Sequence, residues 1–447
     1  MSHAAPIQRS DGALPLTWIV DAGGAAGTTM MADKAVACVA GGAAGTTMAA
    51  DQAVACVAGG AGGTTMAADE AAAHVAVAAI DTVLAMLSFS GACDQRSAPA
   101  IARKLRERGA ATVCILSVRG ESDVLHWLDS DHACGWIAPA AGSEHARGWI
   151  APAADAPAGS PTRLAEVVTD ALHRDFVGAD ALLLGLIGVE GSALPRLSWG
   201  AQPLFAAMPK PVAHWKPGVY ALVDCAARVG EVLDAGIRTV QLRIKRPTDA
   251  DNGWNARLRA EAAASAAAAR DCDATLVIND HWQLAAELGI PAVHLGQEDV
   301  QRLGDAGRAA LLASGTELGI SSHSVWELCR ARSLAPRYIA CGPVWPTSTK
   351  NMPWLPQGLD NLRWWCGRAG APVVAIGGIL DARHVYEAAR AGAAGVCLVR
   401  GLADDTRRAA PALLDAFERG RRDCVAESTS GFWPHPTLPP TGDLLPR

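Results

Sequence analysis

Several apolar segments in the C-terminal half of the chain end in polar side chains that could bind an anion. The clearest is residues 339–344, a short apolar run closed by Gly-Pro that predicts a buried strand. After it come three hydroxyls and an ammonium group, on Thr347, Ser348, Thr349 and Lys350. Such groups hydrogen-bond to phosphate oxygens or pair with them. Taken alone, these residues also fit an ordinary polar loop.

An earlier segment, residues 241–245, combines strand periodicity with long hydrogen-bond donors. It reads Gln-Leu-Arg-Ile-Lys, so strand alternation places Gln241, Arg243 and Lys245 on one face. These donors are costly in a protein core but suited to clamping a diphosphate. The alternative is a charged strand at the rim of a barrel.

Two carboxylates follow the next two predicted strands. Asp280 ends the segment Ile-Asn-Asp, and Asp299 ends the segment Gly-Gln-Glu-Asp. Because Mg²⁺ typically takes one or two carboxylates together with substrate phosphate oxygens, these residues beside a basic clamp predict a Mg²⁺ site. Each also precedes a predicted helix, which it could instead cap.

Two later strand ends carry further candidates. His323 lies in a Ser-Ser-His-Ser segment, where a satisfied structural histidine is the commoner case. Gly377 and Gly378 lack side chains, so their backbone N–H groups could approach a phosphate.

Strand-like and helix-like segments alternate from residue 218 onward. Helices are expected, for example, over residues 258–269 and 382–391. The rhythm of about eight β-α units in about 200 residues predicts an α/β fold, a TIM (β/α)8 barrel, with an open doubly wound sheet as the competitor. The strands are expected to start near Val219, Thr239, Thr275, Ala292, Glu317, Tyr338, Val373 and Gly395.

The N-terminal half contains two internal duplications. Residues 22–75 hold three copies of an 18-residue unit, each predicting a glycine turn and a helix, and residues 132–141 recur at 145–154. The near-identical copies indicate recent duplication without retained function. Helices over 99–108, 161–174 and 179–187 and a strand over 112–118 predict a small, degenerate α/β region, in which no catalytic cluster stands out.

Composition narrows the classes of function. A net charge of −6 and a pI near 6.1 give no electrostatic reason to expect nucleic acid or a membrane surface as partner. The 12 cysteines show no zinc-binding spacing, which indicates free thiols in a reducing cytoplasm. No signal peptide or spanning segment is expected.

The expected parts are a repeat region (1–90), a small α/β region (91–193), a linker (194–217), the barrel (218–422) and a disordered tail (423–447).

Six motifs in order give the barrel half a family resemblance. They are residues 240–245 (Val-Gln-Leu-Arg-Ile-Lys), 278–280, 293–299 (Val-His-Leu-Gly-Gln-Glu-Asp), 319–321, 342–350 and 375–379 (Ala-Ile-Gly-Gly-Ile). From about residue 218 to 402 the chain resembles thiamine phosphate synthase. The N-terminal half faintly resembles hydroxymethylpyrimidine phosphate kinases through residues 23–27, 32–34 and 136–139, but the Gly-Thr-Gly-Cys motif of that family is absent.

The resemblance implies a Mg²⁺-dependent transferase that joins hydroxymethylpyrimidine diphosphate to a thiazole phosphate and releases diphosphate. It assigns catalysis to Arg243, Lys245 and Lys350 and the metal to Asp280 and Asp299. The pyrimidine diphosphate would contact Gln241, Leu242, Arg243, Ile244, Lys245, Asn279, Ser321 and Lys350. The thiazole phosphate would contact Thr347, Ser348, Thr349, Gly377, Val399 and Arg400, the last standing where many members have serine.

Two alternatives stay open. A thiazole tautomerase has a related barrel and a similar Ser-x-His-Ser segment, but the diphosphate clamp and both carboxylates favour the synthase. A non-catalytic binding or regulatory protein of the thiamine pathway is the other class, and the intact polar strand ends argue against it. The partners expected are small molecules, with a homo-oligomer possible.

Overall fold

The computed structural model falls into two compact units, residues 1–204 with 438–447 and residues 205–437. It describes residues 17–21, 75–79, 93–107, 110–119, 124–131, 145–151, 161–190, 194–200, 202, 204–206, 216–347, 353–402, 405–424 and 433–438. Ser348, Thr349 and Lys350 lie outside the described residues. So do the repeats up to residue 74, the first copy of the second duplication and the residues of the kinase resemblance.

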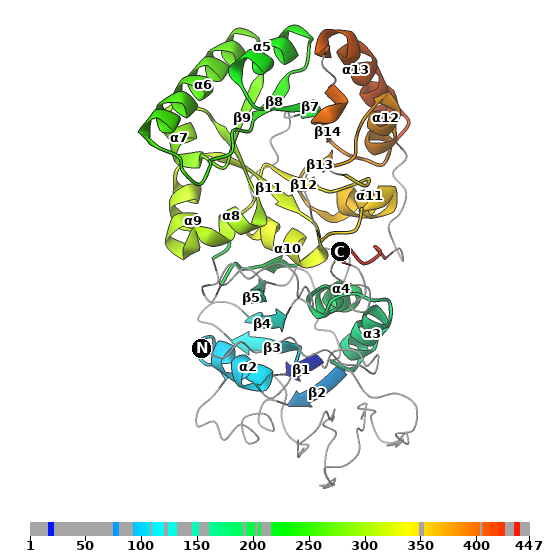
Figure 1. Ribbon diagram of the computed structural model, residues 1–447. Helices are drawn as coiled ribbons and strands as arrows, with labels where there is room; N and C mark the ends of the chain where they lie inside the picture. Colours follow the sequence, from blue (N-terminus) through cyan, green and yellow to red (C-terminus); the bar gives the residue numbers. More distant parts are fainter. Residues whose placement is uncertain are drawn as a thin grey trace, which may run out of the picture. The chain divides into compact units, whose positions relative to one another are not determined.

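The second unit is built on a closed barrel of eight parallel strands (Figure 1). The first and last strands, β7 and β14, pair with each other, which excludes the open sheet. The strands are β7 (Gly218–Val223), β8 (Thr239–Leu242), β9 (Thr275–Asn279), β10 (Ala292–Leu295), β11 (Glu317–Ser322), β12 (Tyr338–Cys341), β13 (Val373–Ile376) and β14 (Gly395–Leu398). Their starts confirm the expected positions, the first within one residue.

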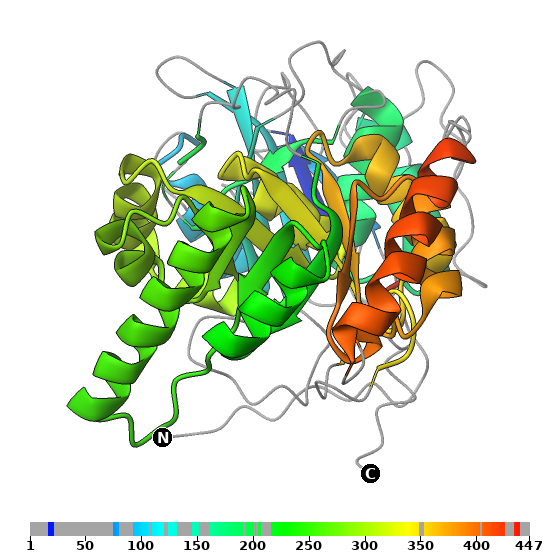
Figure 2. The ribbon, with the colours of Figure 1, turned by 90° about the horizontal axis from the view of Figure 1, so that it is seen from above.

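Helices surround the strands on the outside of the barrel. They are α5 (Ala226–Asp234), α6 (Asn252–Asp271), α7 (Trp282–Glu287), α8 (Gln297–Arg302), α9 (Gly304–Ala313), α10 (Val325–Ser333), α11 (Gly358–Arg368), α12 (Ala382–Arg390), the short η1 (Arg400–Leu402) and α13 (Thr406–Arg422). Figure 2 shows α5 beside α6 and α12 beside α13. Aspartates that accept a backbone N–H set the start of α6 (Asp251), α12 (Asp381) and α13 (Asp405).

The interior of the barrel is a packed core that turns polar toward one end. Inward-facing side chains of six strands meet there: Tyr220, Val277, Ala292, Tyr338, Ala340, Val374 and Cys397. Their alternation with outward-facing residues follows from the two-residue period of a strand. The strands therefore hold the residues at their C-terminal ends in fixed positions around one opening.

The first unit is a six-stranded mixed sheet with helices, which confirms the α/β expectation. Its strand order is β2-β1-β3-β4-β5-β6, parallel from β2 to β3 and antiparallel from β3 to β6. The strands are β1 (Thr17–Asp21), β2 (Val75–Ala79), β3 (Thr112–Arg119), β4 (Val124–Asp131), β5 (His145–Ala151) and β6 (Arg196–Leu197). The helices are α2 (Ala98–Glu107), α3 (Pro161–His173) and α4 (Gly178–Glu190), close to their expected bounds.

Two segments are more ordered than the sequence predicts. The stretch expected as linker contains β6, and Ser198 accepts a hydrogen bond from the Trp149 N–H at 2.7 Å. Residues 433–438 of the tail, expected to be disordered, contact the barrel unit through the side chain of Asn361. In both segments the hydrogen bonds join a side chain to a backbone group that is distant in sequence.

No helix within the described parts of the chain is long and apolar enough to cross a membrane.

Candidate active site

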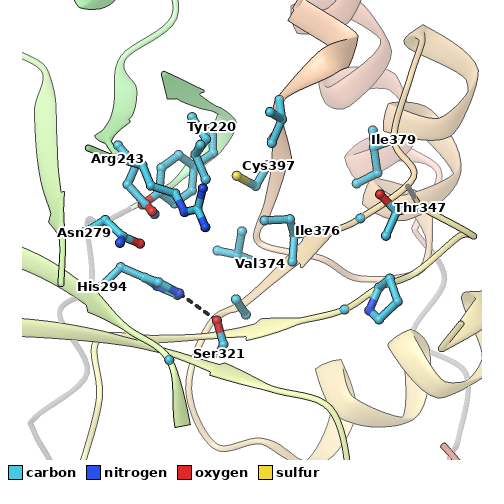
Figure 3. Close-up of a pocket in the computed structure, with 18 of the residues that line it drawn as sticks. Tyr220, Arg243, Asn279, His294, Ser321, Thr347, Val374, Ile376, Ile379 and Cys397 are labelled. Carbon is cyan, nitrogen blue, oxygen red and sulfur yellow. Dashed lines mark hydrogen bonds between the residues drawn. The ribbon is translucent and has the colours of Figure 1, made fainter. Parts of the chain in front are cut away.

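A cavity of about 460 Å³ opens at the C-terminal ends of the barrel strands (Figure 3). Its lining combines most of the predicted site residues: Gln241, Arg243, Lys245, Asn279, Asp280, Asp299, Ser321, Thr347, Gly377, Val399 and Arg400. In Figure 3, Arg243, Asn279 and Ser321 lie on one side and Thr347 on the other. The apolar side chains Val374 and Ile376 lie between them. The pocket therefore has two polar ends joined by an apolar floor.

The basic face comes from β8 and the residues just after it. Gln241, Arg243 and Lys245 all line the cavity, as strand alternation predicts. Leu242 and Ile244 belong to the opposite face and are not among the lining residues. Leu242 is buried in the barrel wall instead.

Beneath the basic face, a chain of hydrogen bonds links five side chains across the barrel. They run in the order Gln241, Tyr220, Tyr338, His294, Ser321, with contacts of 2.9, 2.9, 2.9 and 2.8 Å. The Gln241 amide donates to the Tyr220 hydroxyl, and in the contact between the two tyrosines either hydroxyl can be the donor.

His294 joins Tyr338 to Ser321 through its two ring nitrogens. Nδ1 contacts the Tyr338 hydroxyl and Nε2 contacts Ser321 Oγ. Burial lowers the pKa of His294 to about 4, so the ring is neutral at pH 7, and one nitrogen donates while the other accepts. Ser321, the last residue in this series of hydrogen bonds, lines the pocket.

One glycine makes this arrangement possible. A Cβ on Gly319 would lie 2.2 Å from the Tyr338 ring, so only glycine lets that ring cross the barrel. Gly319 is the first residue of the predicted Gly-Ile-Ser motif.

Asp280 and Asp299 lie on the cavity wall beside the basic face. The pKa of Asp280 is raised, first by burial and then by the charge of Asp299, while His281, Arg243 and Lys245 oppose the shift. A cation between the two carboxylates would relieve that repulsion, and oxygen ligands suit Mg²⁺. Within the described residues no group of three or more His, Cys, Asp or Glu side chains could hold a metal, so phosphate oxygens and water would complete this site.

The helix-cap alternative fits the two aspartates differently. The N-cap of α7 is His281, so Asp280 does not cap that helix. Asp299 lies inside α8, where its Oδ2 accepts the N–H of Gly296 at 3.3 Å and its Oδ1 pairs with Arg302 at 2.6 Å. Asp299 therefore supports the helix start and also faces the cavity.

The other end of the pocket is formed by residues after β12, β13 and β14. Gly377 and Gly378 have φ angles of +94° and +70°, a region that favours glycine. A Cβ on either would lie 2.6 Å from the Pro343–Trp345 segment, so the two backbones touch. Thr347, Val399 and Arg400 complete this end.

His323 also lines the cavity, where it is buried and held on two sides. Its Nδ1 contacts Glu327 Oε2 at 2.9 Å, and its ring stacks on Trp354 at 5.3 Å with an interplanar angle of 6°. These contacts agree with a satisfied histidine that shapes the wall. Cys397 also lines the pocket, but burial raises its thiol pKa to about 12, so it stays protonated.

Sequence reasoning gave no role to Tyr220, Tyr338 or His294. In the sequence each is one polar residue within an apolar strand, which reads as core. The feature of the sequence that could have indicated a role is strand alternation, which turns these side chains toward the barrel interior, as it does Gln241.

The comparison with family models matches the barrel half. A family model described as thiamine monophosphate synthase matches residues 219–402. The thiamine-phosphate synthase of Neisseria meningitidis serogroup B is 46% identical over 201 residues, which are 44% of this chain and 92% of that protein. The chain belongs to the thiamine-phosphate synthase family. It is thus related to transferases of thiamine biosynthesis.

Other thiamine-phosphate synthases align over the same region. The enzyme of Serratia proteamaculans is 41% identical over 213 residues, covering 47% of this chain and 96% of that protein. A solved structure described as thiamine phosphate pyrophosphorylase from Pyrococcus furiosus covers 46% of this chain and 97% of its own, with 25% identity and a TM-score of 0.39.

Proposed function

We propose that the barrel joins hydroxymethylpyrimidine diphosphate to a thiazole phosphate and releases diphosphate. The observation that carries this proposal is the two-ended pocket. One end has two cations and two carboxylates, and the other has a hydroxyl and a glycine pair. A thiazole tautomerase has no diphosphate to bind, so it would not need the first end.

The chemistry requires a leaving group whose charge is neutralised as its bond breaks. The C–O bond to the diphosphate breaks with its electron pair on oxygen, and the thiazole nitrogen forms the new C–N bond. Arg243 and Lys245, with Lys350 by resemblance, stabilise the charge on the departing oxygen. The electron-rich pyrimidine carries the cation, so no protein nucleophile is needed.

Binding of the pyrimidine diphosphate falls to Gln241, Asn279 and Ser321. The contact with His294 Nε2 holds the Ser321 hydroxyl at the pocket wall. Asn279 is buried at the end of β9 and faces the same side. Because the strands hold these side chains in place, little free energy is needed to reorient them during the reaction.

Asp280 and Asp299 would hold Mg²⁺. The ion would supply positive charge to the diphosphate oxygens as they become a leaving group. Thr347, Gly377, Val399 and Arg400 would hold the thiazole phosphate, together with Ser348 and Thr349.

We further propose that the reaction takes place in the cytoplasm, as the free thiols of the described cysteines fit a reducing compartment. A homo-oligomer stays a prediction.

The test is release of diphosphate by the full chain supplied with Mg²⁺ and both substrates. Release that needs both substrates supports the proposal, and release with either alone, or none at all, contradicts it. Lys245→Ala and Lys350→Ala are expected to lower kcat, because their contacts strengthen in the transition state. Thr347→Val is expected to raise mainly the KM for thiazole phosphate, a loss of uniform binding. The reverse split would mean that the two ends are assigned the wrong way round.

A further inference from the structure

A short segment near the end of the chain contacts the loop that borders the pocket. We call this segment, residues 433–437, the C-terminal clip. It lies beyond the residues that match the family model, 219–402. Figure 1 draws it in red near α11.

Asn361 of α11 fastens the clip. Its Oδ1 accepts the backbone N–H of His435 at 2.8 Å, and its Nδ2 donates to the carbonyl of the same residue at 3.0 Å. Nδ2 also contacts Gln357 Oε1 at 3.1 Å. Asn361 and Gln357 are both fully buried, so these bonds are protected from water.

The clip in turn holds the segment just before α11. The N–H of Leu355 donates to the carbonyl of Thr437 at 2.8 Å. His435 Nε2 lies 2.8 Å from the carbonyl of Gln357 and Nδ1 lies 2.9 Å from the carbonyl of Pro436, so the tautomer with the proton on Nε2, or the protonated ring, donates to Gln357. Both backbone groups belong to residues 353–358.

Residues 353–358 do not line the cavity themselves, but they contact residues that do. Gln357 Nε2 donates to the carbonyl of His323 at 2.7 Å, and Trp354 stacks on the His323 ring. The N–H groups of Gln357 and Gly358 donate to the carbonyls of Pro343 and Val344 at 2.7 and 2.9 Å.

The residues after β12 connect residues 353–358 to the glycine pair, Gly377 and Gly378. Val344 and Trp345 donate to the carbonyls of Ile376 and Gly377 at 2.9 and 3.1 Å. Pro343 and Gly377 both line the cavity, and a Cβ on Gly377 would meet Pro343 at 2.6 Å. Each step from the clip to this end of the pocket is therefore a short hydrogen bond or a direct backbone contact.

We propose that the C-terminal clip positions the thiazole-phosphate end of the pocket, with His435 as its positioning residue. His435 does not line the cavity and acts through Gln357 and Pro343. The identity of the ligand at this end rests on the proposed function.

The test compares His435→Ala and His435→Gln with Arg421→Ala in the full chain. His435 is exposed, so its substitution removes the contact with the Gln357 carbonyl and a local contact with the Pro436 carbonyl without opening a core. Arg421 is an exposed residue of α13 that pairs with Glu418, which makes it a control near the clip in sequence. Loss of a bond of about 1 kcal/mol predicts that His435→Ala raises the KM for thiazole phosphate about fivefold.

The pattern of the other readouts separates positioning from general stability. The kcat and the KM for the pyrimidine diphosphate should stay within about twofold in all three variants. Glutamine can donate an N–H to the same carbonyl, so His435→Gln should recover part of the KM. Hydrogen exchange at residues 353–358 should accelerate in His435→Ala and not in Arg421→Ala.

Two results overturn the proposal. One is a lower melting temperature of His435→Ala with an unchanged thiazole phosphate KM, which would make the clip a stability element only. The other is unchanged exchange at residues 353–358. Because exchange needs no substrate, it tests the clip even if the wild-type chain releases no diphosphate, an outcome that would contradict the proposed function instead.

Discussion

The two units place their charged side chains in different surroundings. In the N-terminal sheet, Asp129 is 1% exposed and is paired with Arg147 at 2.9 Å and with Arg106 at 3.6 Å. In the barrel, Arg243 and Asp280 are on the wall of a cavity. Charges paired inside the fold stabilise it, whereas charges held beside open space can act on a ligand. The two units therefore differ in the surroundings of these charges, which are ion-paired in the sheet and face a cavity in the barrel.

Aromatic pairs show the same contrast. Trp127 and Trp149 meet edge to face at 5.0 Å in the core of the sheet. Tyr220 and Tyr338 pack in a similar way at 5.9 Å, but their hydroxyls also carry the hydrogen-bond chain toward Ser321. The hydrogen bonds of the two hydroxyls to each other, to Gln241 and to His294 make the tyrosine pair part of the site.

The largest expected effect separates the two kinds of arginine. Arg243→Ala should lower kcat for diphosphate release by about tenfold to a thousandfold, as for other charge-stabilising donors. Arg147→Cys, in the sheet, should leave kcat within about twofold. Steady-state kinetics of both variants, with circular dichroism to confirm folding, measure the difference. Equal losses of kcat in the two variants would show that facing the cavity does not distinguish Arg243 from Arg147.

The burial of His294 predicts that the stability of the barrel depends on pH. The folded-state pKa of His294 is about 4, against an ordinary value of 6.5. The unfolded chain therefore binds the proton first, and stability falls as the pH drops from about 6.5 to about 4, by about 3 kcal/mol. Urea unfolding at pH 7, 5 and 4 measures the loss. His294→Asn should lose less over the same range, and an identical profile in the variant would show that other groups cause the dependence.

The ion pair of the sheet predicts a smaller effect. The two copies of the second duplication differ at one position, Cys134 in the first and Arg147 in the second. Arg147→Cys makes the copies identical and leaves Asp129 with one weaker partner, so the sheet should lose about 1–2 kcal/mol. Thermal unfolding measures it, and Arg147→Lys should recover part. Unchanged stability in Arg147→Cys would mean that the pair is dispensable.

The smallest expected effect is that of removing the N-terminal unit. A chain that starts at Phe205 keeps every lining residue of the pocket, so its kcat and both KM values should stay within about twofold of those of the full chain. A folded but inactive shortened chain would show that the sheet contributes to catalysis.

The barrel was predictable because each strand carries a local signal. Apolar runs with polar ends gave the strand starts, and alternation gave the inward direction of Gln241, Arg243 and Lys245. Strand alternation also indicates the inward direction of Tyr220, Tyr338 and His294, but not the hydrogen bonds between them, because these partners are distant in sequence and meet only when the barrel closes.

The clip was missed for a related reason. Its prolines and its place after the last barrel helix indicate disorder, and its order depends on one buried side chain, Asn361, 74 residues away. An asparagine in a helix gives no sign in sequence that its amide fastens a distant backbone.

The pairing of β7 with β14 has a consequence for how the barrel could be rearranged. The first strand and the last are neighbours, in register from Gly218 and Gly395. The barrel therefore has one seam, and the chain enters and leaves the ring at strands that lie side by side. A circular permutation that bridged this seam and cut the exposed turn at Gly315, before β11, would keep every strand pair of the ring.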